Sequence, residues 1–398
     1  MPYVNFKEER YSANIQIEKR KKNNKKVIDY ITKNTQKVTD YIPCKEYSFK
    51  KFDGVVFGKE GILDEAEFKV VESKDILCSK FIDCKFQNIK YKDCNFIGCE
   101  FINCKFDEGG VTFQNCFFIK ERTEQMPSLN NKDNLGCVFK NCYIYARFLN
   151  CDLSMALFEN CNICNTSIEL TFMKKTIIKD SEMDKIAFED CNLSGFKTLN
   201  CYIIDLDFND DNNTKFDTET WFDKIPVREK TKAEYEGLYK VYETICDKYK
   251  DNQLVNDSNE YYYLGKTYER KSLKKVIPKF GSYIYWISCG YGQRGLFPVV
   301  TSIIIIIIFT ILYLFLGMEV EEETIRLTIP LLFSTDFKTI LGYINEAFSL
   351  SIGMFGSVGY INAKPIPRTY MVANIEMLLG IIMVGIGIAS LIKKAKDN

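Results

Sequence analysis

The residues with the clearest chemistry lie near the carboxyl end of the chain, in the segment Ser357-Val-Gly-Tyr360. Backbone carbonyl oxygens from such a segment, contributed by several copies of a chain, can replace the hydration shell of a monovalent cation such as K+. The hydroxyl of Ser357 can supply one more oxygen, and Ile361 and Asn362 follow at once. The chemistry expected here is passive coordination of an ion.

Two apolar segments flank this motif and would have to position it. Leu296–Leu316 contains no charged residue, and as a helix its 21 residues would span about 31 Å, which matches the hydrocarbon core of a bilayer. Met371–Ile392 is the second expected span. Between them, Asn345–Phe355 can form a helix that is too short to cross. Residues 345–362 are therefore predicted to be a re-entrant pore helix and filter, lying inside protein or against water.

Charged residues around the two spans predict their orientation. The loop between the spans is acidic, with Glu319 and Glu321–Glu323, while both outer flanks are basic. By the positive-inside rule, both termini face the cytoplasm, and the chain is a multi-pass protein of the cytoplasmic membrane. The basic residues are Lys274, Lys275, Lys279 and Arg294 before the first span, and Lys393, Lys394 and Lys396 after the second.

The stretch Trp286–Lys394 resembles the pore domain of two-transmembrane potassium channels. Besides the pore helix and filter, Ile375-Glu376-x-x-Leu379-Gly380 is similar to the start of the inner helix in bacterial members, including those fused to pentapeptide repeats. Trp286-Ile-Ser-x-Gly290-Tyr-Gly292 resembles the approach to their outer helix. The resemblance implies a homotetramer in which four filters surround one axis and conduct K+ through a membrane.

The filter departs from the family pattern Thr-x-Gly-Tyr-Gly-Asp at its outer end. Ile361 stands where the family has its second glycine, and Asn362 stands where it has aspartate. A β-branched residue adopts the required backbone turn poorly, and the amide removes a charge that would brace the filter. We therefore expect an altered outer ion site and about equal permeability to K+ and Na+.

Three residues of the second span have two interpretations each. Glu376 lies one turn into the apolar segment, where a carboxylate without a partner is costly, so we expect it to brace the filter from behind. The alternative is a carboxylate at the membrane interface. Gly380 and Gly385 lie where channels of this type bend. For these glycines, a gating hinge and close helix packing remain open.

Upstream, apolar residues recur at every fifth position, a period that fits neither a helix nor a single strand. A small residue, often cysteine, lies two positions before most of these centres. Fixed self-similarity of this kind is typical of a stacked repeat. Twelve centres keep one phase, namely Leu153, Phe158, Ile163, Ile168, Met173, Ile178, Met183, Phe188, Leu193, Thr198, Ile203 and Phe208.

This pattern over Lys45–Asp210 resembles the pentapeptide-repeat family, whose fold is a right-handed quadrilateral parallel β-solenoid. The resemblance implies that residues twenty apart stack, as Cys84 on Cys104, and Cys161 on Ser181 on Cys201. We interpret the cysteines as reduced, small core residues. A half zinc site at Cys161-x-x-Cys164 and DNA mimicry by the mildly acidic rod are less favoured than a rigid scaffold.

Composition narrows the function further. The chain has 53 basic residues, 53 acidic residues and no histidine. Catalysis by histidine and histidine-ligated metals are therefore excluded, and zero net charge argues against nucleic-acid binding by the whole chain. We therefore expect that the chain is not an enzyme and that it binds no cofactor and no metal centre.

The expected organisation is multidomain, with a basic N-terminal arm (1–44), the solenoid (45–210), a helical linker hairpin (211–280) and the two-transmembrane pore domain (281–398). The leading hypothesis is a homotetrameric cation channel whose cytoplasmic rods act as sensors or as docking arms for a protein partner. The alternative is a non-conducting, membrane-anchored scaffold that binds a protein through its rod.

Overall fold

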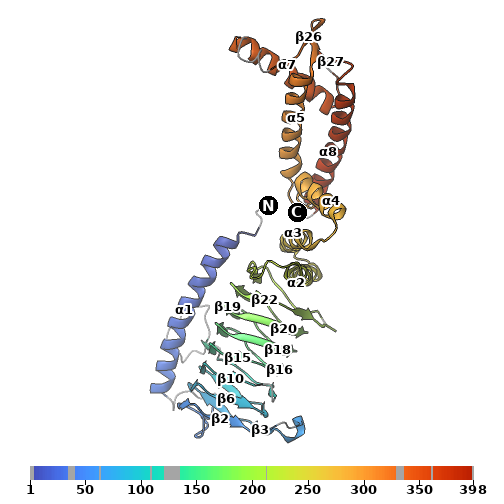
Figure 1. Cartoon of the computed structure of the whole chain (residues 1–398). Coiled ribbons are helices and arrows are strands. Elements are labelled where there is room, and N and C mark those ends of the chain that lie inside the picture. The colour runs from blue at the N-terminus through green and yellow to red at the C-terminus, as the bar shows by residue number, and fades with distance from the viewer. Residues whose placement is uncertain are drawn as a thin grey trace. The chain divides into compact units, whose positions relative to one another are not determined.

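The computed structural model of this chain divides into two compact units, Met1–Ser272 and Leu273–Asn398 (Figure 1). We describe each unit by itself. The described residues are 4–34, 41–61, 64–107, 110–120, 135–211, 213–328, 336–359 and 362–396.

The first unit is built on a solenoid of short parallel strands stacked coil on coil (Figure 1). One sheet has the strand order β1-β5-β9-β14-β17-β19-β21-β24, and the second runs β2-β6-β10-β15-β18-β16-β11-β7-β3 with β20 paired to β18. The eight-residue strands β18 and β20 each pair with strands that elsewhere are separate, so they link neighbouring faces. The parallel β-solenoid that the resemblance to pentapeptide repeats implies is confirmed.

The strands are brief because each covers one face of a coil. Their bounds are β1 (Lys51–Asp53), β2 (Val56–Gly58), β3 (Lys69–Glu72), β4 (Asp75–Leu77), β5 (Lys80–Ile82), β6 (Lys85–Gln87), β7 (Ile89–Lys92), β8 (Asn95–Ile97), β9 (Glu100–Ile102), β10 (Lys105–Phe106), β11 (Val111–Gln114), β12 (Ile119–Lys120), β13 (Leu135–Gly136), β14 (Val138–Lys140), β15 (Tyr143–Ile144), β16 (Arg147–Leu149), β17 (Leu157–Glu159), β18 (Asn162–Glu169), β19 (Ile177–Lys179), β20 (Glu182–Glu189), β21 (Lys197–Leu199), β22 (Tyr202–Ile203), β23 (Leu206–Phe208) and β24 (Trp221–Phe222). A 3-10 turn, η2 (Glu65–Glu67), precedes β3.

The register of the strands explains the five-residue period. Phe81 pairs with Phe101 and Phe86 with Phe106, each twenty residues apart. Their rings stack with centroids 4.8 and 4.7 Å apart, which is the spacing of neighbouring strands. Four pentapeptides therefore complete one such coil. The apolar residue at the middle of each pentapeptide then stacks on the corresponding residue of the preceding coil.

The expected stacking of small residues is present as well. The backbone N–H of Lys105 donates to Cys84 O, and that of Glu182 donates to Cys161 O, so Cys104 lies over Cys84 and Ser181 over Cys161. The N–H of Cys161 also donates to Ser181 Oγ at 3.0 Å. The N–H of Tyr202 donates to Ser181 O, which places Cys201 next in the same column.

Some coils are longer than twenty residues, the first of them between Phe52 and Phe81, which pair at a separation of 29. Tyr91 pairs with Phe113 at a separation of 22 residues, and Phe101 pairs with Phe139 at a separation of 38. In both cases the two rings still stack, at 5.3 and 4.7 Å. The core stacking is therefore kept although these two coils contain more residues.

Corner positions of the solenoid favour asparagine and aspartate, a feature that the sequence reading missed. Asp83, Asn103, Asn141 and Asn160 all have φ between 52° and 54°, a left-handed conformation that these two residue types tolerate best. Their side chains form a ladder, because Asn103 donates to Asp83, Asn141 to Asn103 and Asn160 to Asn141, at 2.9–3.0 Å.

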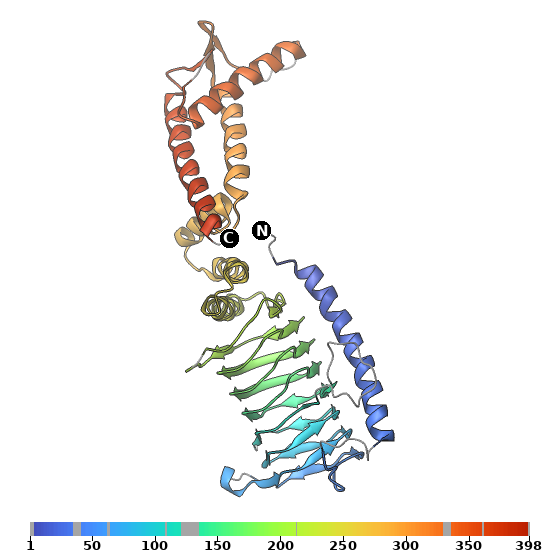
Figure 2. The ribbon, with the colours of Figure 1, turned by 180° about the vertical axis from the view of Figure 1, so that it is seen from behind.

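The basic N-terminal segment forms helix α1 (Phe6–Lys33), which lies along the side of the solenoid in both views (Figures 1 and 2). Ala13, Ile17, Val27 and Ile31 are buried on one face. The basic side chains of this helix do not all face solvent, because Arg20 is only 3% exposed and donates to Met155 O at 3.2 Å.

Two helices, α2 (Lys232–Asp251) and α3 (Val255–Ser272), form the expected helical hairpin. It packs on the last coil, with Phe216 edge-on to Tyr249 at 5.0 Å. Lys248 and Asp210 form a buried ion pair of 2.6 Å at this junction. Burial opposes ionisation of Asp210, but hydrogen bonds from Lys248 and Thr214 hold its pKa below the ordinary value. The hairpin therefore caps the solenoid and belongs to its core.

The second unit is mainly helical. Its elements are α4 (Val276–Cys289), α5 (Phe297–Leu316), β25 (Met318–Val320), β26 (Glu323–Ile325), α7 (Phe337–Phe355), β27 (Ala363–Pro365) and α8 (Tyr370–Lys396). The helices α5 and α8 run side by side, and α7 packs against both near one end (Figures 1 and 2). The strands β26-β25-β27 form an antiparallel sheet.

Substitution of Phe101 measures how much the stacked rings contribute to the stability of the first unit. This ring is fully buried between Phe81 and Phe139, so Phe101→Ala leaves a cavity in the column. We expect a loss of about 3–5 kcal/mol in the free energy of unfolding, measured by urea titration with far-UV circular dichroism. Phe117→Ala is the control, because Phe117 is 50% exposed and its removal should change stability by less than about 0.5 kcal/mol. An equal loss of stability in the two variants would contradict a stabilising role for the stacked rings.

Candidate functional site

Two helices of the second unit are long and apolar enough to cross a membrane. They are Phe297–Leu316, with mean hydropathy 3.0, and Tyr370–Ser390, with mean hydropathy 2.1. Both expose isoleucine, leucine and valine over much of their length, including Ile303, Ile307 and Ile311 on α5 and Leu378, Ile381 and Ile388 on α8. A continuous apolar surface of this kind marks a face that lipid or another protein covers.

The helix before the filter motif is longer than the sequence suggested. The expected pore helix was Asn345–Phe355, whereas α7 begins at Phe337. Asp336 caps it by accepting the N–H of Lys338 at 3.2 Å. Its amino-terminal half exposes Phe337 and Leu341. The helix can begin this early because the side chain of Asp336 satisfies a backbone N–H group of its first turn.

The expected filter residues are only partly described. Ser357, Val358 and Gly359 follow α7, Asn362 precedes β27, and Tyr360 and Ile361 lie outside the described residues. Ser357 and Gly359 have φ of 54° and 89°. The N–H groups of Ser357 and Val358 donate to Met354 O and Gly353 O at 3.1 Å. In this chain the first part of the motif is therefore a turn that closes α7.

Glu376 joins the three packed helices of this unit. Its carboxylate is fully buried, accepts a hydrogen bond from Tyr313 of α5 at 2.8 Å and makes a very short one with Ser351 of α7. Ser351 also donates to Ile306 O of α5 at 3.0 Å. The sequence reading named Glu376 but missed both partners, which lie 63 and 25 residues away along the chain.

The two glycines assigned to bending differ in their surroundings. A Cβ on Gly380 would lie 1.9 Å from Phe355 O, so α8 meets the end of α7 backbone to backbone at this point. A Cβ on Gly385 would meet nothing within 4 Å. Close helix packing is therefore present at Gly380 and absent at Gly385, and a gating hinge at either glycine stays a prediction.

Helix α4 carries a separate apolar face. Val276, Phe280, Tyr283 and Ile287 recur at helical spacing, and all are exposed. Ile277 and Ile284 widen this face, and Lys274 and Lys275 precede it. The hydroxyl of Thr301 in α5 donates to Ile287 O at 2.7 Å. An apolar helical stripe flanked by lysines is typical of a segment lying at a membrane surface.

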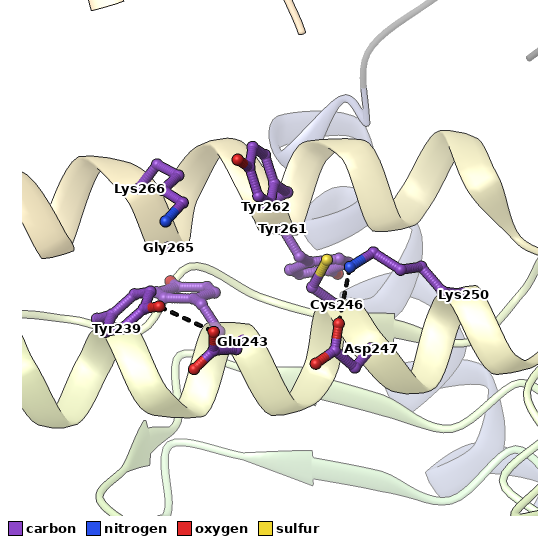
Figure 3. Close-up of a pocket in the computed structure, with 10 residues that line it drawn as sticks. Tyr239, Glu243, Cys246, Asp247, Lys250, Tyr261, Tyr262, Gly265 and Lys266 are labelled. Atoms are coloured by element: carbon purple, nitrogen blue, oxygen red, sulfur yellow. Dashed lines mark hydrogen bonds and ion pairs between the residues drawn. The ribbon is translucent and has the colours of Figure 1, made fainter. Parts of the chain in front are cut away.

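The first unit holds a pocket between α2 and α3, with a cavity volume of about 120 Å3 (Figure 3). Two fully buried rings, Tyr242 and Tyr261, form part of its wall. The lining residues are Tyr239, Tyr242, Glu243, Cys246, Asp247, Lys250, Tyr261, Tyr262, Gly265 and Lys266. The sequence reading assigned the helical tyrosines of this region to packing and did not identify the pocket.

The two carboxylates that line the pocket each have a hydrogen-bond partner on the same helix. On α2, Tyr239 donates to Glu243 at 2.8 Å and Lys250 donates to Asp247 at 2.7 Å (Figure 3). Burial and Glu243 together raise the pKa of Tyr239, and Asp247 raises that of Lys250. Tyr239 therefore stays neutral and Lys250 stays charged at neutral pH.

Lys266 of α3 lies over two tyrosine rings of the pocket. Its ammonium is 5.5 Å from the ring centroid of Tyr239 and 5.7 Å from that of Tyr262. It also donates to Glu269 at 2.7 Å. Burial opposes its charge, but Glu269 prevails and raises the pKa of Lys266. This wall of the pocket thus accommodates an ammonium group.

The cysteines of the solenoid are free thiols, and all from Cys84 to Cys201 are buried. Cys161 donates to Phe139 O at 3.4 Å, as the small residues of other coils do. Among the residues that the structure describes, no cluster of three or more His, Cys, Asp or Glu side chains could hold a metal ion. Burial raises the pKa of Cys191 and of Cys201 to about 12, so these thiols are unreactive at neutral pH.

Gly380→Ala should destabilise the second unit, because the added methyl group would overlap Phe355 O. We expect a loss of about 1–3 kcal/mol, measured as a lower thermal unfolding midpoint of the detergent-solubilised chain. Gly385→Ala adds the same methyl group where nothing lies within 4 Å, and it should be neutral or stabilising. Unchanged stability of Gly380→Ala would contradict the close contact.

Because the pKa values of the buried thiols are raised, we expect the protein to lose stability at alkaline pH. Unfolded cysteine ionises near pH 8.5, whereas Cys191 and Cys201 have pKa values of about 12 in the fold. The folded state therefore keeps protons that the unfolded state releases, and stability falls as the pH rises from about 8.5 to 12. The double variant Cys191→Ala/Cys201→Ala should lose less stability over roughly pH 8.5–11 in urea titrations. An unchanged slope would refute this account.

Comparison with known proteins adds little beyond these observations. No family model matches the chain, and no curated protein matches it. Solved structures with some similarity include a trypsin-treated variant of QnrB1, a plasmid-mediated fluoroquinolone resistance protein, at 13% identity over 41% of this chain and 91% of that chain, with a TM-score of 0.18. HetL, a pentapeptide-repeat protein involved in heterocyst differentiation regulation from Nostoc sp. strain PCC 7120, has 7% identity over 48% of this chain and 92% of its own, with a TM-score of 0.14. By its own period and strand register, the region from β3 to β24 is a parallel β-solenoid built on a five-residue repeat.

Proposed function

We propose that this chain forms a homotetrameric pore for monovalent cations in the cytoplasmic membrane, with the solenoid as a cytoplasmic sensor or docking arm. The observation that carries the proposal is the buried hydrogen-bonded group of Glu376, Ser351 and Tyr313. A carboxylate between apolar helices is costly without partners. Here it ties α7 to both long apolar helices and so fixes the end of α7 from which the filter motif departs.

The order of elements supports a pore. The apolar helix α5 is followed by the amphipathic α7, the motif Ser357-Val-Gly-Tyr360 and the apolar helix α8. In this proposal, backbone oxygens of residues 357–360 from four copies replace the hydration shell of K+. Ile361 and Asn362 stand at the outer end, so Na+ would pass nearly as well as K+. Ion flow of this kind is passive and needs no cofactor.

The surroundings of the two apolar helices support a membrane location. The lysines before α4 and after α8 and the acidic loop of β25 and β26 favour cytoplasmic termini by the positive-inside rule. The exposed apolar face of α4 would lie in the headgroup region of the cytoplasmic leaflet, with Lys274 and Lys275 near anionic lipid.

The solenoid would act through its surface. Four rods in one tetramer would bind a cytoplasmic protein with avidity, and the capping hairpin is the segment that leads from each rod towards α4. The rod is mildly acidic and the chain as a whole is neutral, so a nucleic-acid partner is not part of the proposal.

A second candidate is a membrane-anchored scaffold that does not conduct. It is favoured by the turn at Ser357 and Val358, whose N–H groups are bonded to the last carbonyls of α7, and by Ile361 in place of a filter glycine. In this alternative, the solenoid binds a protein partner and the second unit only holds it at the membrane.

Ion flux through purified full-length protein in liposomes distinguishes the two candidates. With vesicles loaded with K+, we expect flux from the unsubstituted chain and a fall of at least about tenfold for Gly359→Asp, because a carboxylate would enter the ion path. We further expect similar rates when Na+ replaces K+.

Gly54→Asp is the matched control for that substitution. Gly54 lies on the solenoid with nothing within 4 Å of an added Cβ, so the same chemical change should leave flux unaltered. Absence of flux from the unsubstituted protein in tetrameric form would favour the scaffold, and flux that survives Gly359→Asp would place any ion path elsewhere. A strong preference for K+ would refute the expected effect of Ile361 and Asn362.

A further inference from the structure

Two exposed phenylalanines lie on one outer face of the solenoid with an aspartate between them. Parallel bridges pair Phe117 with Asp152, and Asp152 with Phe172. The two rings are 50% and 46% exposed, whereas a core ring such as Phe118 is fully buried. Because the bridged positions are parallel and in register, the three side chains leave the same face in the same direction. We refer to these three residues as the outer column, and its paired exposed rings mark an interaction surface.

The corner beside Phe172 departs from the pattern of its neighbours. Leu170 has a φ of 50° and is 51% exposed. The equivalent corner residues of the adjoining coils are Asn115, Asn150 and Asp190, with φ between 50° and 53°, and Asn150 donates to Asn115 at 2.9 Å. Leucine tolerates this backbone poorly, cannot continue the ladder and remains exposed. The stability of the fold therefore does not account for a leucine at this corner, whereas an apolar contact with a partner would.

The space between the two rings of the outer column corresponds to one stacked group. Phe117 and Phe172 are two strand spacings apart, about 9.6 Å. Asp152 is much shorter than either ring, and one of its carboxylate oxygens accepts the N–H of Ser154 at 2.9 Å. It forms no ion pair with the described residues. A flat group that entered between the rings would lie about 4.8 Å from each, above a carboxylate without a counter-ion.

A guanidinium group has the shape and charge that this position requires. It is planar, always charged, stacks on aromatic faces and donates two parallel hydrogen bonds to a carboxylate. A separation of about 4.8 Å from each ring lies within the range of a cation–π contact. The ring of Phe172 already has one cation near it, because the ammonium of Lys174 is 5.2 Å from its centroid. An anionic ligand would instead be repelled by Asp152.

The described part of the first unit does not supply this guanidinium group. Its described arginines are either paired with carboxylates or buried, namely Arg10, Arg20, Arg147, Arg228 and Arg270. The expected occupant is therefore a different protein and not a second copy of this rod.

We propose that the outer column and Leu170 bind an arginine-bearing segment of a cytoplasmic protein. The guanidinium group stacks between the two phenylalanine rings and pairs with Asp152, while an apolar side chain of the same segment covers Leu170. The inference rests on the docking role proposed for the solenoid and gives that role a partner chemistry. It does not depend on conduction by the second unit, so a protein that binds the segment without conducting ions would remove only the pore.

Fluorescence anisotropy of a labelled peptide tests this recognition on the detergent-solubilised full-length protein. The probe is Gly-Leu-Ser-Arg-Ser-Leu-Gly, because alternate residues of an extended segment face the same side. In two comparison peptides the arginine is replaced by citrulline, which keeps the shape without the charge, or by lysine, which keeps the charge without the plane. We expect the arginine peptide to bind at least about tenfold more tightly than the citrulline peptide and about threefold more tightly than the lysine peptide.

Substitutions then assign the binding to the outer column. Asp152→Asn keeps an acceptor for the backbone N–H but removes the charge, so it should weaken binding of the arginine peptide about tenfold and leave the citrulline peptide unaffected. Phe117→Ala and Phe172→Ala should each weaken the arginine peptide about fivefold. The matched controls are Asp184→Asn and Ile204→Ala, which lie on another face of the solenoid and should leave the affinity unaltered.

Leu170→Asn separates binding from stability. Asparagine suits the left-handed corner, so the urea midpoint of unfolding should rise, whereas the affinity for the arginine peptide should fall about threefold. Higher stability with unchanged affinity would remove Leu170 from the surface. The whole proposal is overturned if the arginine peptide does not bind, if the citrulline peptide binds as tightly, or if Asp152→Asn and Phe117→Ala leave the affinity unchanged.

Discussion

Parallel stacking of identical positions is the constraint on which the first unit depends. A ring at the centre of one coil lies on the ring of the coil before it at the spacing of the strands, as Phe101 lies between Phe81 and Phe139. Ring stacking and strand pairing therefore cannot be satisfied separately, since a shift in one breaks the other. This mutual dependence explains why the core keeps its order where the coils lengthen.

A stack of coils has two ends, and its last layer needs cover. The hairpin of α2 and α3 provides it at the carboxyl end, where Tyr249 and Tyr261 pack on Phe222 and the hydroxyl of Tyr261 donates to Phe222 O. The tyrosines continue into the hairpin as stacked rings, including Tyr242 on Tyr268 at 5.4 Å. One continuous hydrophobic core thus extends from the solenoid into the pocket-bearing helices.

The solenoid could be predicted because its information is local. A period of five residues is visible in the sequence, and with the resemblance to pentapeptide repeats it predicts which residues stack wherever a coil has twenty residues. Other contacts leave no such mark. Arg20 and Asn24 are buried by α1 against the backbone of the solenoid, although a basic run normally indicates a solvated segment. In the second unit, Glu376 stands out as a carboxylate in an apolar run, but nothing in the spacing identifies Tyr313 and Ser351 as its partners, because the three come together only when the helices pack.

The long coil between β9 and β14 has a consequence for how such rods evolve. Phe101 and Phe139 meet as closely as rings twenty residues apart, so a coil can gain residues without a compensating mutation in the core. Within the run of stacked phenylalanines, duplication or deletion of a whole coil would still place a ring on a ring. The rod can therefore become longer or shorter by whole coils during evolution, without any change in the capping hairpin or in the sequence that follows it.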